Sequence, residues 1–128
     1  MIFYNKFYSF STLNNCLIYL ELRPPVILNT PVDLEVDKSN RLFMVECNAT
    51  GAPLPKFRWY KDDHEIHSGF VSINMADDNI VSQLTRNRIT ISDSGVYKCV
   101  AVNDGGWDET TATIHVQGTY ASFLFLCG

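Results

Sequence analysis

The sequence lacks an excess of positive charge and any long apolar run. Its 128 residues carry 10 Lys and Arg against 14 Asp and Glu, which gives a net charge of −4. Such a chain has no basic field with which to hold nucleic acid or an anionic membrane surface. Its apolar stretches at 16–20 and 121–127 are far shorter than the ~20 residues needed to cross a bilayer. We therefore expect neither nucleic-acid binding nor direct membrane insertion.

Motifs for catalysis and for metal binding are also missing. His64, His67 and His115 do not form a zinc-binding spacing with the cysteines. The acidic pairs at 62–63 and 77–78 lie outside any EF-hand loop, so we interpret them as solvated loop acids. No Ser-His-Asp, Cys-His or Gly-rich phosphate motif occurs in a workable context. We predict no enzymatic activity, no metal site and no cofactor.

Proline and glycine are too few for a disordered or fibrous chain, and 46% of the residues are apolar, as in a globular domain. The length suits one domain with a proper core. The first twenty residues hold one Lys and lack a small-residue cleavage site, so they make a poor signal peptide. We interpret the chain as a fragment of a longer protein, with an unassigned tail at 1–22, a domain at 23–117 and a C-terminal tail at 118–128.

Short alternating stretches, with turn formers between them and no helical periodicity, predict an all-β sandwich. Alternation places Cys47, Trp59 and Leu84 on inward faces, and Tyr97 and Cys99 together on another. Residues 23–27 and 32–36 are expected to be two pieces of one edge strand. Further strands are expected at 41–50, 56–61, 64–67, 80–89, 96–103 and 107–116, while 68–79 has no strand pattern, with a loop at 77–78.

The stretch 93–99 starts with a tight turn. Asp93 and Ser94 are turn formers, and Gly95 suits a turn because glycine accepts positive φ. If Asp93 is partly buried, a cation should lie beside it, and Arg86 and Arg88 are the nearest in sequence. The indole N–H of a buried Trp and the hydroxyl of a buried Tyr each need a hydrogen-bond acceptor as well.

These features, taken together, resemble the I-set of the immunoglobulin superfamily over residues 24–117. The resemblance implies an immunoglobulin-like, two-sheet Greek-key sandwich without catalytic activity. It also implies a Cys47–Cys99 disulfide packed on Trp59, and a Tyr97 hydroxyl bonded to backbone near residue 91 or 93. Arg86 departs from the family, whose members often carry Ile or Val there. The motifs are Pro24-Pro25, Cys47, Gly51-x-Pro53-x-Pro55, Trp59-Tyr60-Lys61-Asp62, Leu84, Asp93-Ser94-Gly95-x-Tyr97-x-Cys99, Ala101-x-Asn103 and Gly106.

Two functional interpretations stay open. The motifs around Trp59 and Asn103 look like immunoglobulin modules of titin- and twitchin-type muscle proteins, where a cytoplasmic spacer or docking domain of the sarcomere or cytoskeleton would keep its cysteines reduced. They are equally compatible with ectodomain modules of adhesion molecules and receptors at the cell surface. There the disulfide would form, and Asn48, in the sequon Asn48-Ala49-Thr50, would carry a glycan.

Either interpretation makes the chain a protein-binding module beside neighbouring immunoglobulin or fibronectin-type domains. Aromatic and apolar residues on an exposed sheet face are typical of an interface. The alternative is that they favour strands or close a hairpin end. Cys16 and Cys127 lie outside the patterned region, and we treat them as free or as foreign to the domain. The outward candidates are Tyr60, Val100, Val102 and Trp107 on one sheet, with Leu42 and Met44 on the strand at 41–50.

Overall fold

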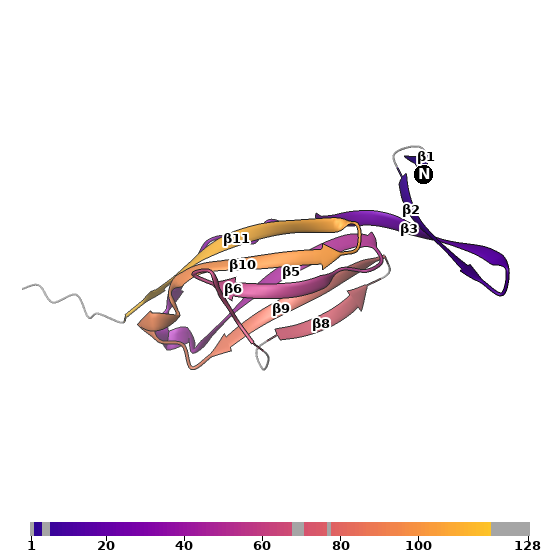
Figure 1. The fold of residues 1–128 in the computed structure, drawn as a ribbon. Coiled ribbons are helices and arrows are strands. Elements are labelled where there is room, and N and C mark those ends of the chain that lie inside the picture. The colour runs from indigo at the N-terminus through magenta and orange to yellow at the C-terminus, as the bar shows by residue number, and fades with distance from the viewer. Residues whose placement is uncertain (1, 4–5, 68–70, 77, 119–128) are drawn as a thin grey trace, which may run out of the picture.

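A computed structural model describes residues 2–3, 6–67, 71–76 and 78–118 (Figure 1). Within these residues the strands form two sheets, in the orders β1-β2-β3-β5-β9-β8 and β4-β11-β10-β6-β7. The predicted all-β, two-sheet sandwich is therefore confirmed. The loop predicted at 77–78 lies partly outside the described residues, as does almost all of the C-terminal tail with Cys127.

The first sheet contains β1 (Ile2–Phe3), β2 (Lys6–Leu13), β3 (Cys16–Ile27), β5 (Leu42–Ala52), β8 (Val71–Ala76) and β9 (Asn79–Asn87). The second contains β4 (Leu34–Asp37), β6 (Lys56–Lys61), β7 (His64–Glu65), β10 (Gly95–Asn103) and β11 (Gly106–Gln117). β4 runs parallel to β11, whereas the other pairs within the described residues are antiparallel. Two short 3-10 helices, η1 (Lys38–Asn40) and η2 (Ile91–Asp93), connect the sheets. No helix among the described residues has the length and hydropathy of a membrane span.

The core lies between the sheets, where strand alternation directs every second side chain inward. Along β5 the buried positions alternate with exposed or half-buried ones, and Cys47 is fully buried. The predicted inward residues Trp59, Leu84, Tyr97 and Cys99 are at most 2% exposed. Their positions confirm the predicted inward face.

The N-terminal tail, left unassigned from the sequence, contains a β-hairpin. β2 pairs with β3 from Phe7–Leu22 to Leu13–Cys16, and β3 then continues past residue 23 into the sandwich, with a shift of register between Arg23 and Val26. Figure 1 shows the hairpin projecting from one end of the sandwich. Because its described side chains face no core, they carry no inward–outward alternation from which the strands could have been read.

Four further expectations need correction. The segment 32–36 does not continue the edge strand at 23–27. Residues 34–37 form β4, which belongs to the other sheet and pairs with β11. Residues 71–76 form β8, an outer strand where Val71 packs against the core while Ile73 and Met75 stay exposed, which hides its period. The strand expected at 64–67 is shorter in the structure, where β7 contains only His64–Glu65. Gly95 does not take a positive φ in the left-handed region, unlike Gly106.

Candidate functional site

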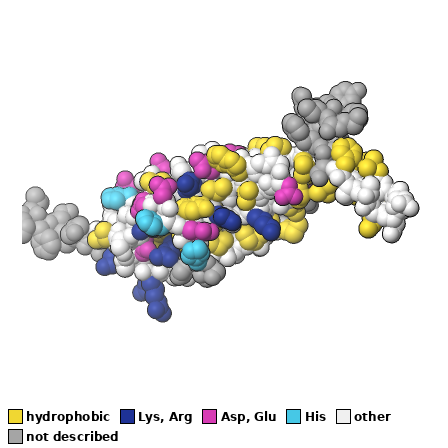
Figure 2. All heavy atoms as spheres, in the orientation of Figure 1, with side chains coloured by type: hydrophobic (Ala, Val, Ile, Leu, Met, Phe, Trp, Pro, Cys, Tyr) yellow, Lys and Arg dark blue, Asp and Glu magenta, His cyan; other side chains and the backbone are white. Residues whose placement is uncertain are grey.

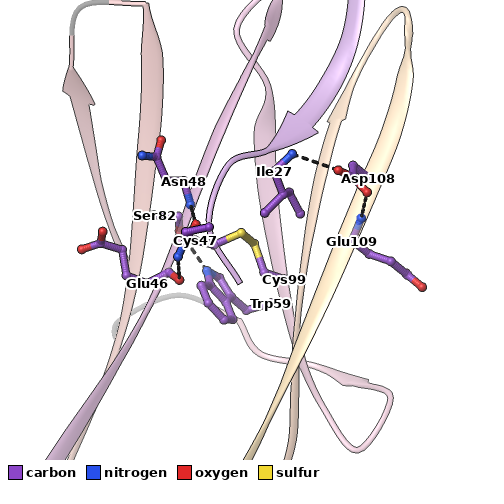
Figure 3. The surroundings of a disulfide bond; sticks show 10 residues. Ile27, Glu46, Cys47, Asn48, Trp59, Ser82, Cys99, Asp108 and Glu109 are labelled. Atoms are coloured by element: carbon purple, nitrogen blue, oxygen red, sulfur yellow. Dashed lines mark hydrogen bonds between the residues drawn. A yellow bond between two sulfur atoms is a disulfide. The ribbon is translucent and has the colours of Figure 1, made fainter. Parts of the chain in front are cut away.

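The centre of the sandwich is the Cys47–Cys99 disulfide, which joins β5 of one sheet to β10 of the other (Figure 3). The two Cα atoms are 6.5 Å apart, within the range that a disulfide spans. Trp59 packs beside the bridge, and its Nε1–H donates a 2.8 Å hydrogen bond to Ser82 Oγ. Ser82 is itself fully buried, so each polar group satisfies the other away from water.

The sequence predicts that the Trp59 indole needs an acceptor, and the structure identifies this acceptor as Ser82. The signal was present, because Ser82 is two residues before Leu84 and so shares its inward face. Cross-strand pairing then sets Ser82 opposite Cys47. A lone hydroxyl at an inward position of a strand is therefore a sound candidate for the partner of a buried indole.

At one end of the core, the Tyr97 hydroxyl makes the predicted hydrogen bond to nearby backbone. Its hydroxyl donates a 2.6 Å hydrogen bond to the backbone O of Asp93. Burial raises the pKa of Tyr97 to about 12, and the negative charge of Asp93 acts in the same direction. The phenol therefore remains a donor at every physiological pH.

The Asp93 carboxylate is held by Arg86, one of its two predicted partners. Arg86 Nη2 lies 2.8 Å from Asp93 Oδ1, while the backbone N–H of Thr90 donates to Oδ2 at 2.8 Å. Burial by itself raises the pKa of Asp93, but these two hydrogen bonds and the charges of Arg86 and Lys61 outweigh it and leave the pKa below its ordinary value. The departure from the family at Arg86 thus has a structural reason.

Asn48, the glycan acceptor of the sequon, is half-buried rather than fully outward. Its backbone N–H donates to Asn29 Oδ1 at 2.6 Å, and its own Oδ1 is buried without a hydrogen-bond partner among the described residues. The Thr50 hydroxyl donates to the backbone O of Asp78 at 3.1 Å. Both polar residues of the sequon thus lie against neighbouring segments, and glycosylation stays a prediction.

The outward face of β6, β10 and β11 brings four interface candidates together. Val102 lies opposite Trp107 on β11, and Lys98 lies opposite Tyr60 on β6. Val100 sits between these two rows on the same face, because outward positions alternate along β10. Trp107 is 63% exposed, whereas the other three candidates are half-buried. The four predicted candidates therefore share one face of this sheet, and Trp107 is the most exposed of them.

Charged groups lie among these four residues. Lys98 Nζ lies 5.0 Å from the ring centroid of Tyr60 and 3.2 Å from Asp63 Oδ1. Arg58 and Glu109 lie on either side of Val100. A depression of about 330 Å³ lies at one end and is lined by Pro53, Leu54, Lys56, Val102, Asn103 and Asp104. Such a surface combines apolar contact with cationic groups for a partner's carboxylates.

Leu42 and Met44 do not belong to this surface. They are 51% and 49% exposed on β5, which lies in the other sheet. The structure thus separates the interface candidates into two faces. No cluster of three or more metal-ligating side chains occurs among the described residues.

The immunoglobulin I-set domain model matches residues 25–116. The chain belongs to the immunoglobulin I-set family. This I-set domain is 36% identical over 86 residues to the muscle M-line assembly protein unc-89 of Caenorhabditis elegans, covering 67% of the chain and 1% of that relative. It is 38% identical over 94 residues to human hemicentin-1, covering 73% of the chain and 2% of the relative. It is 36% identical over 99 residues to rat vascular endothelial growth factor receptor 1, with 77% and 7% covered.

Solved structures that this I-set domain resembles include titin domains. A chimeric titin Z1Z2 superposes with a TM-score of 0.65 at 27% identity, covering 76% of this chain and 98% of that one. Titin domain M7 superposes with a TM-score of 0.64 at 25% identity, covering 75% and 96%. The resemblance to the I-set is thereby confirmed. The relatives include both muscle proteins and receptor or adhesion proteins.

Proposed function

We propose that this I-set domain is a non-catalytic, protein-binding module of a larger multidomain protein, acting as a spacer or docking domain of the titin and twitchin type. The support is its similarity to unc-89 and to titin domains. It spans only 1% to 7% of the length of the relatives described above, so the proposal concerns the role of a single domain.

The observation that carries the spacer role is the path of the chain. Figure 1 shows β3 entering the sandwich at one end, while β11 finishes at the opposite end. Between them β4 pairs in parallel with β11, from Leu34–Ile114 to Asp37–Gln117. Tension applied to the two ends pulls these strands in opposite directions along their axes, so their hydrogen bonds are loaded together in shear. That arrangement suits a module placed in series with its neighbours.

The outward face around Trp107 and Arg58 supports the docking role. Exposed Trp and Arg are the residues that most often carry binding energy at interfaces. One structural neighbour is titin M10 in complex with an immunoglobulin domain of obscurin-like 1, so an immunoglobulin domain is a suitable class of partner. An acidic partner surface would complement the cations on β6.

A photo-crosslinking amino acid at position 107 tests the docking role. In the native tissue extract, we expect one protein to be captured from position 107 and competed away by unlabelled domain. The matched control places the same probe at Thr85, a half-buried position on the other sheet. Equal capture from both positions, or capture that the unlabelled domain does not compete, contradicts docking through this face.

A second candidate, an ectodomain module of an adhesion molecule or receptor, is favoured by the Cys47–Cys99 disulfide. Intact mass of the protein from its native source, before and after reduction and deglycosylation, separates the two. A glycan on Asn48 with an oxidised pair places the domain outside the cell and rejects the muscle role. Cysteine thiols that react with a thiol reagent on unfolding, in a protein that carries no glycan, support the muscle role.

A further inference from the structure

The hairpin of β2 and β3 exposes apolar side chains on both of its faces. Figure 2 shows hydrophobic atoms along this projection. On one face Phe10 lies opposite Tyr19, with ring centroids 6.4 Å apart; on the other, Leu13 lies opposite Cys16. Six large apolar residues here are each 43% to 66% exposed: Phe10, Leu13, Leu17, Ile18, Tyr19 and Leu20.

The same hairpin has an open strand edge. β3 pairs with β2 over Cys16–Leu22, but its pairing with β5 starts only at Arg23. The second edge of β3 therefore has no strand partner among the described residues over 16–22. Sheet proteins normally protect such edges with charged side chains, Pro or bulges. On this edge residues 16–20 contain no charged residue and no Pro, and Glu21 and Pro24-Pro25 come only after them, so the run 16–20 is the unprotected part.

We infer that this edge of β3 pairs, antiparallel, with the same edge of a second copy of the chain. A two-fold axis at Ile18 sets the apolar run 16–20 of each copy against that of the other. Cys16 of one copy then lies opposite Leu20 of the other. Beyond the run, Glu21 faces Asn15 rather than another acid, so no like charges oppose one another. The pairing is isologous and closes at two copies.

The exposed area favours a second copy. A large aromatic side chain has a surface of about 150–250 Å². With about half of each side chain exposed, these six residues together leave on the order of 500 Å² of apolar surface in water. A standard interface buries about 800 Å² on each partner. The paired backbone edge and the flanking polar side chains supply the rest. Since both faces of the hairpin are apolar, edge pairing shields parts of both, whereas covering one face would leave the other in water.

Sedimentation velocity of the full chain from about 1 to 100 µM tests this inference. We expect a monomer–dimer equilibrium that Ile18→Lys weakens by at least about tenfold, because it sets two like charges at the axis. The control is Val32→Lys, which adds the same charge at a 73% exposed residue outside the hairpin and should leave the equilibrium unchanged. Tryptophan fluorescence, to which the buried Trp59 contributes, checks that each variant keeps its core.

Cross-linking tests the register. With Cys127→Ser as the parent, Leu20→Cys should give a covalent dimer on mild oxidation, because positions 16 and 20 face each other across the axis. Tyr19→Cys places its thiol on the opposite face from Cys16 and should give little. A chain that stays monomeric at every concentration, equal weakening by both Lys variants, or equal cross-linking by both Cys variants overturns the inference.

Discussion

Replacing Gly95 by Ala should destabilise the domain through Asp62 rather than through backbone strain. A Cβ at Gly95 would lie 2.7 Å from Asp62 Oδ2 and 3.0 Å from Oδ1. Asp62 Oδ1 accepts a 2.9 Å hydrogen bond from the backbone N–H of Val96. To make room, the carboxylate must move and lose that bond. We expect a loss of about 1–2 kcal/mol in the free energy of unfolding, measured by urea denaturation followed by tryptophan fluorescence.

The matched background is Asp62→Ala, which removes the obstructing carboxylate. There Gly95→Ala should cost no more than about 0.5 kcal/mol, because the clash is gone and Ala restricts the unfolded chain more than Gly does. The coupling between the two sites is then about 1 kcal/mol or more. If Gly95→Ala costs the same with Asp62 present or absent, the close approach is not the reason for this glycine.

Three further predictions concern the core. Ser82→Ala leaves the Trp59 indole without its acceptor and should cost about 1–3 kcal/mol in urea denaturation; no measurable cost would contradict that role. Leu84→Ala, at a residue with no exposed surface, should cost about 2–5 kcal/mol by the same assay, and a smaller loss would show that the site collapses. Because the pKa of Asp93 beside Arg86 is lowered from its ordinary 3.8, its carboxylate stabilises the fold above that pH. This stabilisation is lost as the pH falls through the lowered value, so Asp93→Asn should flatten thermal stability against pH below about 4, and an unchanged slope would argue against it.

The inward half of the molecule could be predicted from the sequence. Cys47, Trp59, Tyr97 and Cys99 mark two facing sheets, and period-2 alternation then places their neighbours. This works because a side chain between two sheets must be apolar or have a hydrogen-bond partner. The Tyr97 bond to Asp93 and the ion pair with Arg86 followed from the same requirement.

The outer parts could not be predicted in the same way. The β2–β3 hairpin has no core beneath its described side chains, and β8 packs against the core through Val71, so neither shows a clear inward period. β4 reads as a strand, but only its position in space shows which sheet it joins. Gly95 was assigned to a turn for its φ, whereas it is needed because Asp62 passes close by, a contact 33 residues away along the chain.

The core signature does not separate the two functional interpretations. A muscle protein and a receptor match this chain equally well, at 36% identity each, and a shared sandwich core suffices for both. What distinguishes one I-set domain from another must therefore lie at outward positions, which the core leaves free to vary. Here those positions include Trp107 and Arg58 on one sheet and Met44 on the other. Partner choice should change when Arg58 is reversed to Glu, while the free energy of unfolding stays within about 0.5 kcal/mol.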